Sequence, residues 1–256
     1  MIRLRQLMFA VFFLFHPLTL LAVDTLVDPL DSPAWAVMHE RILGNEPVVF
    51  DDRVTVMTPE FAEDPMNVPV SVTVNRLEGV QSIVIFADLN PIQKVMEFKP
   101  VHLKPYIAFR FKVEQSTPVR AAVKTSDGVW HVGGRWIDAA GGGCTAPGAG
   151  RLVDNWHETL MNVTTRIWHD SGHLQRLRLR IMHPMDTGLA PGIPEFYIEQ
   201  LNLRDDSGQT MADIQLFQPV SENPVFTFEI SDEIKSKVIT LAGTDNNGNR
   251  LDAVIR

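Results

Sequence analysis

The sequence predicts an all-β protein built from two β-sandwiches. Short apolar stretches with period-two alternation recur from about residue 53 to the C-terminal end. Turn residues separate them, among them Ser126-Asp127-Gly128 and Asn247-Gly248. A glycine-rich segment, residues 139–150, interrupts this pattern near the middle of the chain. Many short strands with regularly spaced turns are typical of β-sandwiches, so we expect one sandwich on each side of that segment.

The first 22 residues have the layout of a secretory signal peptide. A basic start precedes an apolar run from Leu7 to Phe15, and Ala22 supplies a small residue for cleavage. Pro17 and the shortness of the run argue against a membrane-spanning helix. Leu20 departs from the preferred cleavage pattern, which leaves an uncleaved anchor as the alternative. We therefore expect an exported protein that has no membrane contact once residues 1–22 are removed.

The charge of the chain excludes several classes of partner. Lys and Arg number 23 and Asp and Glu 31, for a net charge of −8. Removal of Arg3 and Arg5 with the signal peptide changes this charge to −10. An acidic surface disfavours nucleic acids and anionic membranes, and we expect neither as a partner.

Motifs of catalysis and cofactor binding are missing from the sequence. It contains no GxSxG, HExxH or CxxC motif and no P-loop lysine. The residues alone therefore give no argument for an enzyme active site, and we predict no cofactor.

Two arrangements of histidine leave metal binding open as an alternative. His169 and His173 are four residues apart, although the stretch "HDSGH" favours a turn over a helix. His183 lies beside Met182 and Met185, and soft thioether ligands suit Cu(I). Packing is the simpler explanation for these residues, and we predict no metal site.

A helix is predicted over residues 32–44, since Ser32 can cap its start and Gly44 can end it. Its apolar residues recur at helical spacing and are expected to pack on a sheet: Trp35, Met38, Ile42 and Leu43. Strands are predicted at residues 68–74, 82–91, 95–99, 106–113, 118–125 and 129–137. In the second half they are predicted at residues 163–169, 174–184, 195–205, 209–217, 224–230, 237–245 and 250–256. Pro69 suggests that its strand is an edge strand. The predicted domains are residues 32–138 and 151–256.

The only cysteine, Cys144, lies in the glycine-rich segment. A single thiol in an exported chain cannot form an internal disulfide, and it indicates a mixed disulfide, a covalent adduct or a reactive role. A buried, inert cysteine and an ordinary linker are the alternatives. Because its neighbours are small, we expect an exposed thiol on a flexible loop. No Lys or Arg is adjacent to it, so nothing predicts a strongly lowered pKa.

Longer stretches resemble a known family. The stretch "LRLRIMHPMDTG", followed by "IPEFYIEQLNLRDDSGQTMADIQLFQPVSENPVFTFEI", resembles SoxZ of the sulfur-oxidising system. The stretches "DPMNVPVSVTV", "IVIFADLNP" and "FRFKVEQSTPVRAAVKTSDGVW" resemble SoxY. From about Ser32 onward the chain resembles a fused SoxYZ-like carrier, closest to the type associated with quinoprotein dehydrogenases.

The resemblance implies two immunoglobulin-like sandwiches with a stable interface. It also implies that the protein is not an enzyme but a periplasmic carrier of intermediates of sulfur oxidation such as thiosulfate. Cys144 would be the covalent attachment residue. Glycines would give its arm mobility: Gly141, Gly142, Gly143, Gly148 and Gly150. The partners would be periplasmic sulfur-oxidising enzymes or a quinoprotein dehydrogenase system.

One departure from the family opens an alternative. The family's cysteine arm ends the SoxY chain, whereas here Thr145, Ala146, Pro147 and a whole domain follow Cys144. A loop fixed at both ends must enter a narrow channel doubled over, and Pro147 stiffens it. The alternative function is a binding or scaffold accessory protein of a periplasmic quinoprotein (PQQ) alcohol dehydrogenase system.

Overall fold

The computed structural model describes residues 27–148, 155–170, 174–231, 234, 236 and 238–255. The predicted signal peptide and Gly150 lie outside the described residues. In these residues two helical segments are present, α1 (Trp35–Leu43) and the 3-10 helix η2 (Trp156–Thr159). The strands are β1 (Val48–Phe50), β2 (Val54–Met57), β3 (Phe61–Ala62), β4 (Val68–Val74), β5 (Val80–Ala87), β6 (Lys94–Lys99), β7 (Tyr106–Phe111), β8 (Thr117–Thr125) and β9 (Trp130–Ala139). They continue with β10 (Val163–Asp170), β11 (Leu174–Ile181), β12 (Ile198–Arg204), β13 (Thr210–Leu216), β14 (Val225–Ser231), β15 (Ile239–Asp245) and β16 (Arg250–Ile255). The predicted all-β, two-sandwich fold is confirmed.

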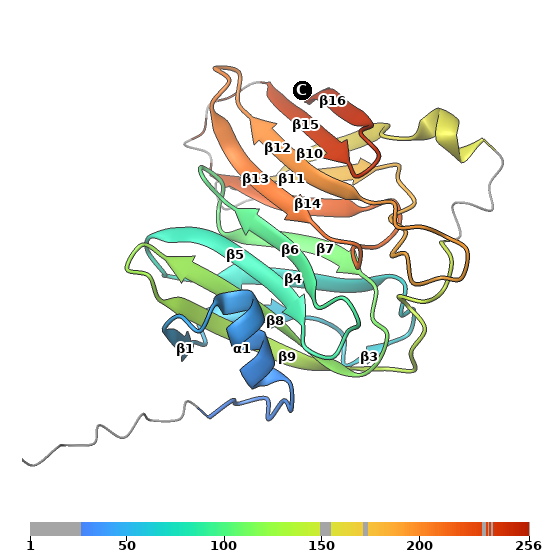
Figure 1. Cartoon of the computed structure of the whole chain (residues 1–256). Coiled ribbons are helices and arrows are strands. Elements are labelled where there is room, and N and C mark those ends of the chain that lie inside the picture. The colour runs from blue at the N-terminus through green and yellow to red at the C-terminus, as the bar shows by residue number, and fades with distance from the viewer. Residues whose placement is uncertain are drawn as a thin grey trace, which may run out of the picture.

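The strands form two sheets, and each sheet runs through both halves of the chain (Figure 1). The ten-stranded sheet has the order β1-β9-β8-β5-β6-β13-β12-β15-β16, with β3 beside β9, and the six-stranded sheet has the order β10-β11-β14-β7-β4-β2. The halves join where β6 pairs with β13 and β7 with β14, both antiparallel. One hydrophobic core fills the space between the sheets in both halves. The expected stable interface is thus confirmed, and it consists of shared sheets.

Helix α1 covers the outer face of the ten-stranded sheet in the N-terminal half (Figure 1). Trp35, Met38 and Leu43 are buried against β5, β8 and β9, as the helical spacing predicts. This cover explains why β5 is apolar on both faces. Gly44 ends the helix at φ +67°, as expected. No helix of the described residues is both long and apolar enough to cross a membrane.

Two local predictions are wrong. The helix begins at Trp35 and its N-cap position is Ala34, because Ser32 instead accepts the Ala34 amide with its hydroxyl (3.3 Å) in a turn before the helix. Strand β4 lies between β2 and β7, so it is not an edge strand. Strand β2 pairs only with residues 71–74 of β4. Pro69, which has no amide hydrogen, therefore lies beyond the end of β2.

Both predicted hairpin turns are confirmed. Residues 126–128 connect β8 and β9, and Asn247-Gly248 connects β15 and β16. Gly128 and Gly248 have φ values of +86° and +84°, a conformation that favours glycine.

Candidate functional site

The loop after β9 brings Cys144 back onto the end of β7. Cys144 is 0% exposed, so the expectation of an exposed thiol is wrong. Its Sγ donates a hydrogen bond to the carbonyl of Lys112 (3.6 Å), and the Gly143 amide donates to the carbonyl of Val113 (3.1 Å). The small neighbours of Cys144 do not bury it. Segments distant in sequence do so.

The carboxylate of Glu114 holds the backbone on both sides of the peptide bond after Cys144. It accepts hydrogen bonds from the amides of Cys144 (2.9 Å) and Thr145 (3.1 Å) and from the Thr145 hydroxyl (3.0 Å). The amide of Glu114 itself donates to the side chain of Asn90 (3.0 Å). One carboxylate from the N-terminal half therefore fixes the loop at the position of the thiol.

The C-terminal half also contacts the cysteine. The Thr187 hydroxyl donates to the carbonyl of Cys144 (2.6 Å) and accepts from the Leu189 amide (3.2 Å). Thr187 belongs to the stretch "HPMDTG", residues 183–188, on which the resemblance of the second half rests. We call residues 112–114 together with Thr187 the Cys144 docking site. It needs both halves of the chain.

Beneath the loop lies a buried lysine, Lys112, which is 1% exposed. Its ammonium group donates a hydrogen bond to the carbonyl of Met185. Burial lowers the pKa of Lys112, and the nearby charges of Asp186, Cys144 and Glu222 oppose this shift. The docking site therefore contains a cation whose charged form is disfavoured by its surroundings.

Burial also controls the acidity of the thiol. Burial, and then the negative charge of Glu114, raises the pKa of Cys144 to about 12, although the Lys112 ammonium acts in the opposite direction. At neutral pH the docked cysteine is a protonated thiol. Because the thiolate is the nucleophile, the loop must leave the docking site before Cys144 reacts efficiently.

The glycines of the loop allow this close packing. Gly141 and Gly142 have φ values of +103° and +87°. A Cβ atom on Gly143 would lie 2.1 Å from the carbonyl oxygen of Pro65, and one on Gly148 would lie 2.9 Å from the carboxylate of Glu222. Glycine is therefore required at Gly143, where the obstacle is backbone, and favoured at Gly141 and Gly142, whereas at Gly148 the Glu222 side chain can move aside. Their role in mobility stays a prediction.

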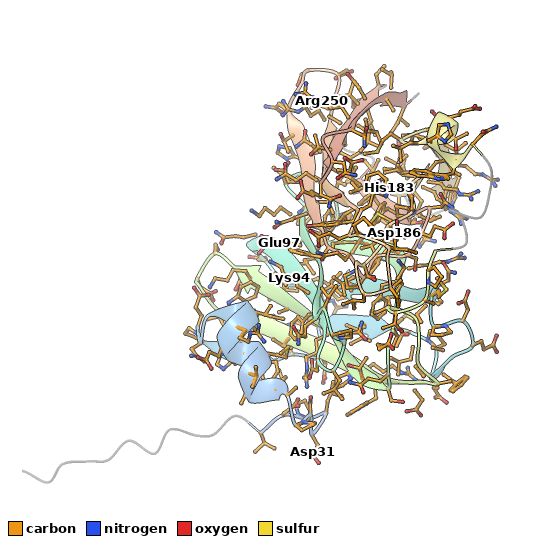
Figure 2. The ribbon with its side chains drawn as sticks, turned by 45° about the vertical axis from the view of Figure 1, so that its right-hand side comes forward. Asp31, Lys94, Glu97, His183, Asp186 and Arg250 are labelled. Atoms are coloured by element: carbon orange, nitrogen blue, oxygen red, sulfur yellow. The ribbon has the colours of Figure 1, made fainter. Side chains whose placement is uncertain are left out.

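His183 has a structural environment. Its Nδ1 accepts the Met185 amide (3.0 Å), its Nε2 lies 3.4 Å from the Asp245 carboxylate, and its ring packs 4.4 Å from that of Phe196. Both ring nitrogens thus face protein groups, which leaves the copper alternative without support. Figure 2 shows His183 and Asp186 where the two halves meet.

Metal binding elsewhere finds no support in the part of the chain that the structure describes. In that part, no group of three or more His, Cys, Asp and Glu residues is arranged to hold a metal ion. The alternative of a metal shared by His169 and His173 concerns side chains that lie outside the described part of the structure.

Sequence reasoning missed three residues of the docking site, namely Lys112, Glu114 and Thr187. Only Thr187 carried a signal, because it belongs to a stretch that resembles SoxZ. Lys112 and Glu114 follow a strand whose alternation places both on its outer side, and nothing local indicates that the other half covers them.

Fold and site together define a class of protein, in which two β-sandwiches share their sheets and bury a single cysteine at the junction. Residues 39–144 match the family model of the sulfur oxidation protein SoxY, and residues 166–255 match that of the sulphur oxidation protein SoxZ. The chain is therefore a SoxYZ-like fusion of a SoxY domain and a SoxZ domain. The SoxY match ends at Cys144 itself.

Among solved structures, the chain is similar to the sulfur carrier protein SoxY from Chlorobium limicola f thiosulfatophilum, with 21% identity and a TM-score of 0.38. That similarity covers 42% of this chain and 96% of the other. No curated protein matches the chain.

Proposed function

We propose that the protein is a non-enzymatic carrier of sulfur-oxidation intermediates, which are attached covalently to Cys144. One observation carries this proposal. The single cysteine of the chain lies at the end of the SoxY match, at a site to which the SoxY and SoxZ domains both contribute contacts. A cargo on this residue would be presented at the junction of the two domains.

Loading of thiosulfate requires a partner. A disulfide-type bond forms between Cys144 Sγ and the outer sulfur of thiosulfate, the thiol loses its proton, and two electrons leave. The carrier supplies the thiol, and a partner oxidoreductase must accept the two electrons. This division of labour agrees with a chain in which the sequence predicts no catalytic group.

The docked loop is the resting state in this proposal. In that state Cys144 is buried and protonated, which protects it from oxidation by small molecules. Undocking breaks the hydrogen bonds to Glu114 and Thr187 and returns the thiol to water, where its pKa falls toward the ordinary value. A partner that binds the undocked loop would shift this equilibrium.

The direct test is intact-protein mass spectrometry on protein isolated from the native periplasm without reductant. We expect adducts of one or more sulfur atoms, or of thiosulfonate, on Cys144, and none in the Cys144→Ser variant. A free thiol under all growth conditions, or unchanged pathway flux in cells that carry Cys144→Ser, would contradict the proposal.

The burial of the thiol favours one alternative, an accessory protein of a periplasmic quinoprotein (PQQ) alcohol dehydrogenase system in which the cysteine is incidental. This alternative predicts a stable complex with the dehydrogenase that survives Cys144→Ser, and a cysteine without sulfur adducts. Co-purification of the tagged wild-type and Cys144→Ser chains from the same cells distinguishes the two functions.

The proposed location is the periplasm, and the signal-peptide pattern of residues 1–22 supports it. Deletion of residues 1–22 is expected to leave the protein in the cytoplasm on cell fractionation. N-terminal sequencing of the native protein would locate the cleavage site. A native protein that retains Met1 would favour an uncleaved anchor.

A further inference from the structure

The outer face of the six-stranded sheet carries a hollow of about 580 Å³ that is lined by three arginines. Arg110 comes from β7, and Arg178 and Arg180 come from neighbouring outward positions of β11. We call it the arginine hollow. Asn67 and Asn223 add amide groups to its wall, and Asp64 and Glu222 add carboxylates.

The three guanidinium groups have no acidic partner within the described part of the chain. Asp64 is engaged by the Met66 amide (3.0 Å) and the Asn67 side chain (2.9 Å), and Glu222 accepts from the Asn223 side chain (3.0 Å). Neither carboxylate forms an ion pair with these arginines. By contrast Arg176, on the same face of β11, pairs with Glu229 at 3.0 Å.

A further positive charge lies at the margin of the hollow. Arg166 of β10 is directly opposite Arg178 in the sheet, and like charges in such cross-strand pairs are destabilising. Four arginines on one sheet face that form no ion pair with any described residue are unexpected in a chain of net charge −8. A bound anion would remove their repulsion.

Arginine also indicates which kind of anion fits. Its planar guanidinium donates paired hydrogen bonds that match the oxygens of phosphate-like groups and carboxylates. Donors from two strands converge on the hollow, and two side-chain amides add neutral donors. Such a set suits a compact group with several equivalent oxygens, which is the geometry of a tetrahedral oxyanion.

The arginine hollow lies beside the docked loop at two places. Next to Asp64, the carbonyl of Pro65 accepts the Val113 amide (2.8 Å) and leaves no space for a Cβ on Gly143. The carboxylate of Glu222, which lines the hollow, would lie 2.9 Å from a Cβ atom on Gly148. The hollow is therefore adjacent to the segment that carries Cys144.

We propose that the arginine hollow binds a tetrahedral oxyanion, either free in solution or as the terminal sulfonate of a group held on Cys144. That the anion is a sulfur compound rests on the proposed function, whereas the binding of an oxyanion does not. The volume exceeds that of one free oxyanion, which leaves space for a group that enters while still attached to the loop.

The first experiment uses the full chain with Cys144→Ser, which removes covalent chemistry. Sodium thiosulfate, and then sodium sulfate, is titrated while NMR follows the arginine Nε–H resonances. We expect saturable shifts. Affinity should weaken about tenfold for each arginine lost in Arg178→Gln and Arg180→Gln. Arg110→Gln, on β7, should weaken the affinity by a similar factor. Because it leaves β11 unchanged, this result would show that the weakening does not come from a folding defect in β11.

Arg250→Gln is the matched control, because it removes the same charge from β16, which belongs to the other sheet. In Figure 2 Arg250 lies far from Asp186 and the junction of the halves. Binding should be unchanged in this variant.

The second experiment asks whether the anion is free or attached. Tetrathionate is added to the wild-type chain. The Cys144 thiolate attacks a central sulfur and expels thiosulfate, which leaves a thiosulfonate group on Cys144 without any further oxidant. After removal of free anion, arginine shifts that disappear in Arg178→Gln would assign the site to the attached group. Shifts with free thiosulfate alone would assign it to a free anion.

Absence of shifts in both experiments would overturn the proposal, as would equal weakening in Arg250→Gln. Binding of a polyglutamate peptide through these arginines, without binding of either oxyanion, would also overturn it and assign the face to an acidic protein segment. These outcomes are separate from the carrier function, which depends on adducts of Cys144 in the native protein.

Discussion

Two long cationic side chains are each only 1% exposed, and they lie in different surroundings. Arg120 of β8 donates from its two Nη groups to Asp28 (2.9 and 2.6 Å) and from its single Nε–H to both oxygens of Asp88 (3.0 Å). Its guanidinium also stacks on Trp35 at 4.6 Å. Lys112, beneath Cys144, donates to a backbone carbonyl instead. Among the described residues, no carboxylate forms an ion pair with Lys112.

The difference separates a structural site from one that opens in the proposed function. The Arg120 cluster joins the segment before α1 to β8 of the ten-stranded sheet, and two carboxylates form ion pairs with its guanidinium. At the Cys144 docking site the charges are only partly balanced, and the loop is held by individual hydrogen bonds. A loop that releases a thiol cannot be fixed as tightly as a core element. The predictions below test this contrast.

The largest effect is expected for Arg120→Met. Loss of the guanidinium leaves Asp28 and Asp88 buried without a counter-charge, which should lower the free energy of unfolding by about 3–5 kcal/mol. Urea denaturation of the wild-type chain and the variant measures this loss in the free energy of unfolding. Arg135→Met is the control, because Arg135 pairs with Glu60 at the exposed surface (3.2 Å) and should cost at most about 1 kcal/mol. Equal losses would contradict the structural role of Arg120.

The pH dependence of Cys144 reactivity should be the next largest effect. The docked thiol has a pKa of about 12, above the ordinary thiol value of 9.0. Docking is therefore fully favoured below pH 9 and loses this contribution as the pH rises toward 12. The rate of alkylation by iodoacetamide should keep rising about tenfold per pH unit above 9, whereas the urea-unfolded chain should level off there. A native profile that levels off near pH 9 would show that the thiol is mostly undocked.

Lys112→Met should cost less than Arg120→Met, about 1–3 kcal/mol. It leaves the Met185 carbonyl without its donor, but it also removes a cation whose burial is unfavourable. Thermal and urea denaturation of both variants under identical conditions make the comparison. If Lys112→Met were the more destabilising of the two, the contrast between the two sites would be wrong.

Glu114→Ala should release the loop without unfolding the protein. It removes the acceptor for three donor groups, the amides of Cys144 and Thr145 and the Thr145 hydroxyl. Alkylation of Cys144 at pH 8 should accelerate at least about tenfold. Glu78→Ala, at an exposed loop position, should leave the rate unchanged. An unchanged rate in Glu114→Ala would mean that Glu114 does not hold the loop.

Thr187→Val should have the smallest effect, because it removes one hydrogen bond to the Cys144 carbonyl. The loss of about 1 kcal/mol corresponds to roughly fivefold faster alkylation. Thr187→Ser keeps the hydroxyl and should restore the wild-type rate. If Thr187→Ser and Thr187→Val were alkylated at the same rate, the contact of the C-terminal half with the loop would not contribute to docking.

Part of the candidate site could be predicted from sequence. Cys144 stands out as the only thiol, and residues 183–188 stand out by resemblance. The burial of Cys144 could not be predicted, because its neighbours in the sequence are only small residues. Lys112 and Glu114 lie about 30 residues before Cys144 in sequence, and Thr187 lies 43 residues after it. The expectation of an exposed thiol failed for that reason.

By itself the sequence determined the β class, the helix face on which Trp35 and Met38 lie, and the turns at Gly128 and Gly248. These features depend on side-chain periodicity and on backbone conformations that glycine favours, which are local properties. Only the tertiary structure decided that the halves share both sheets and that Cys144 is docked between them. The pairing of β6 with β13, and the contact of Thr187 with Cys144, depend on which distant segments meet. The pattern of neighbouring residues in the sequence carries no information about which distant segments meet.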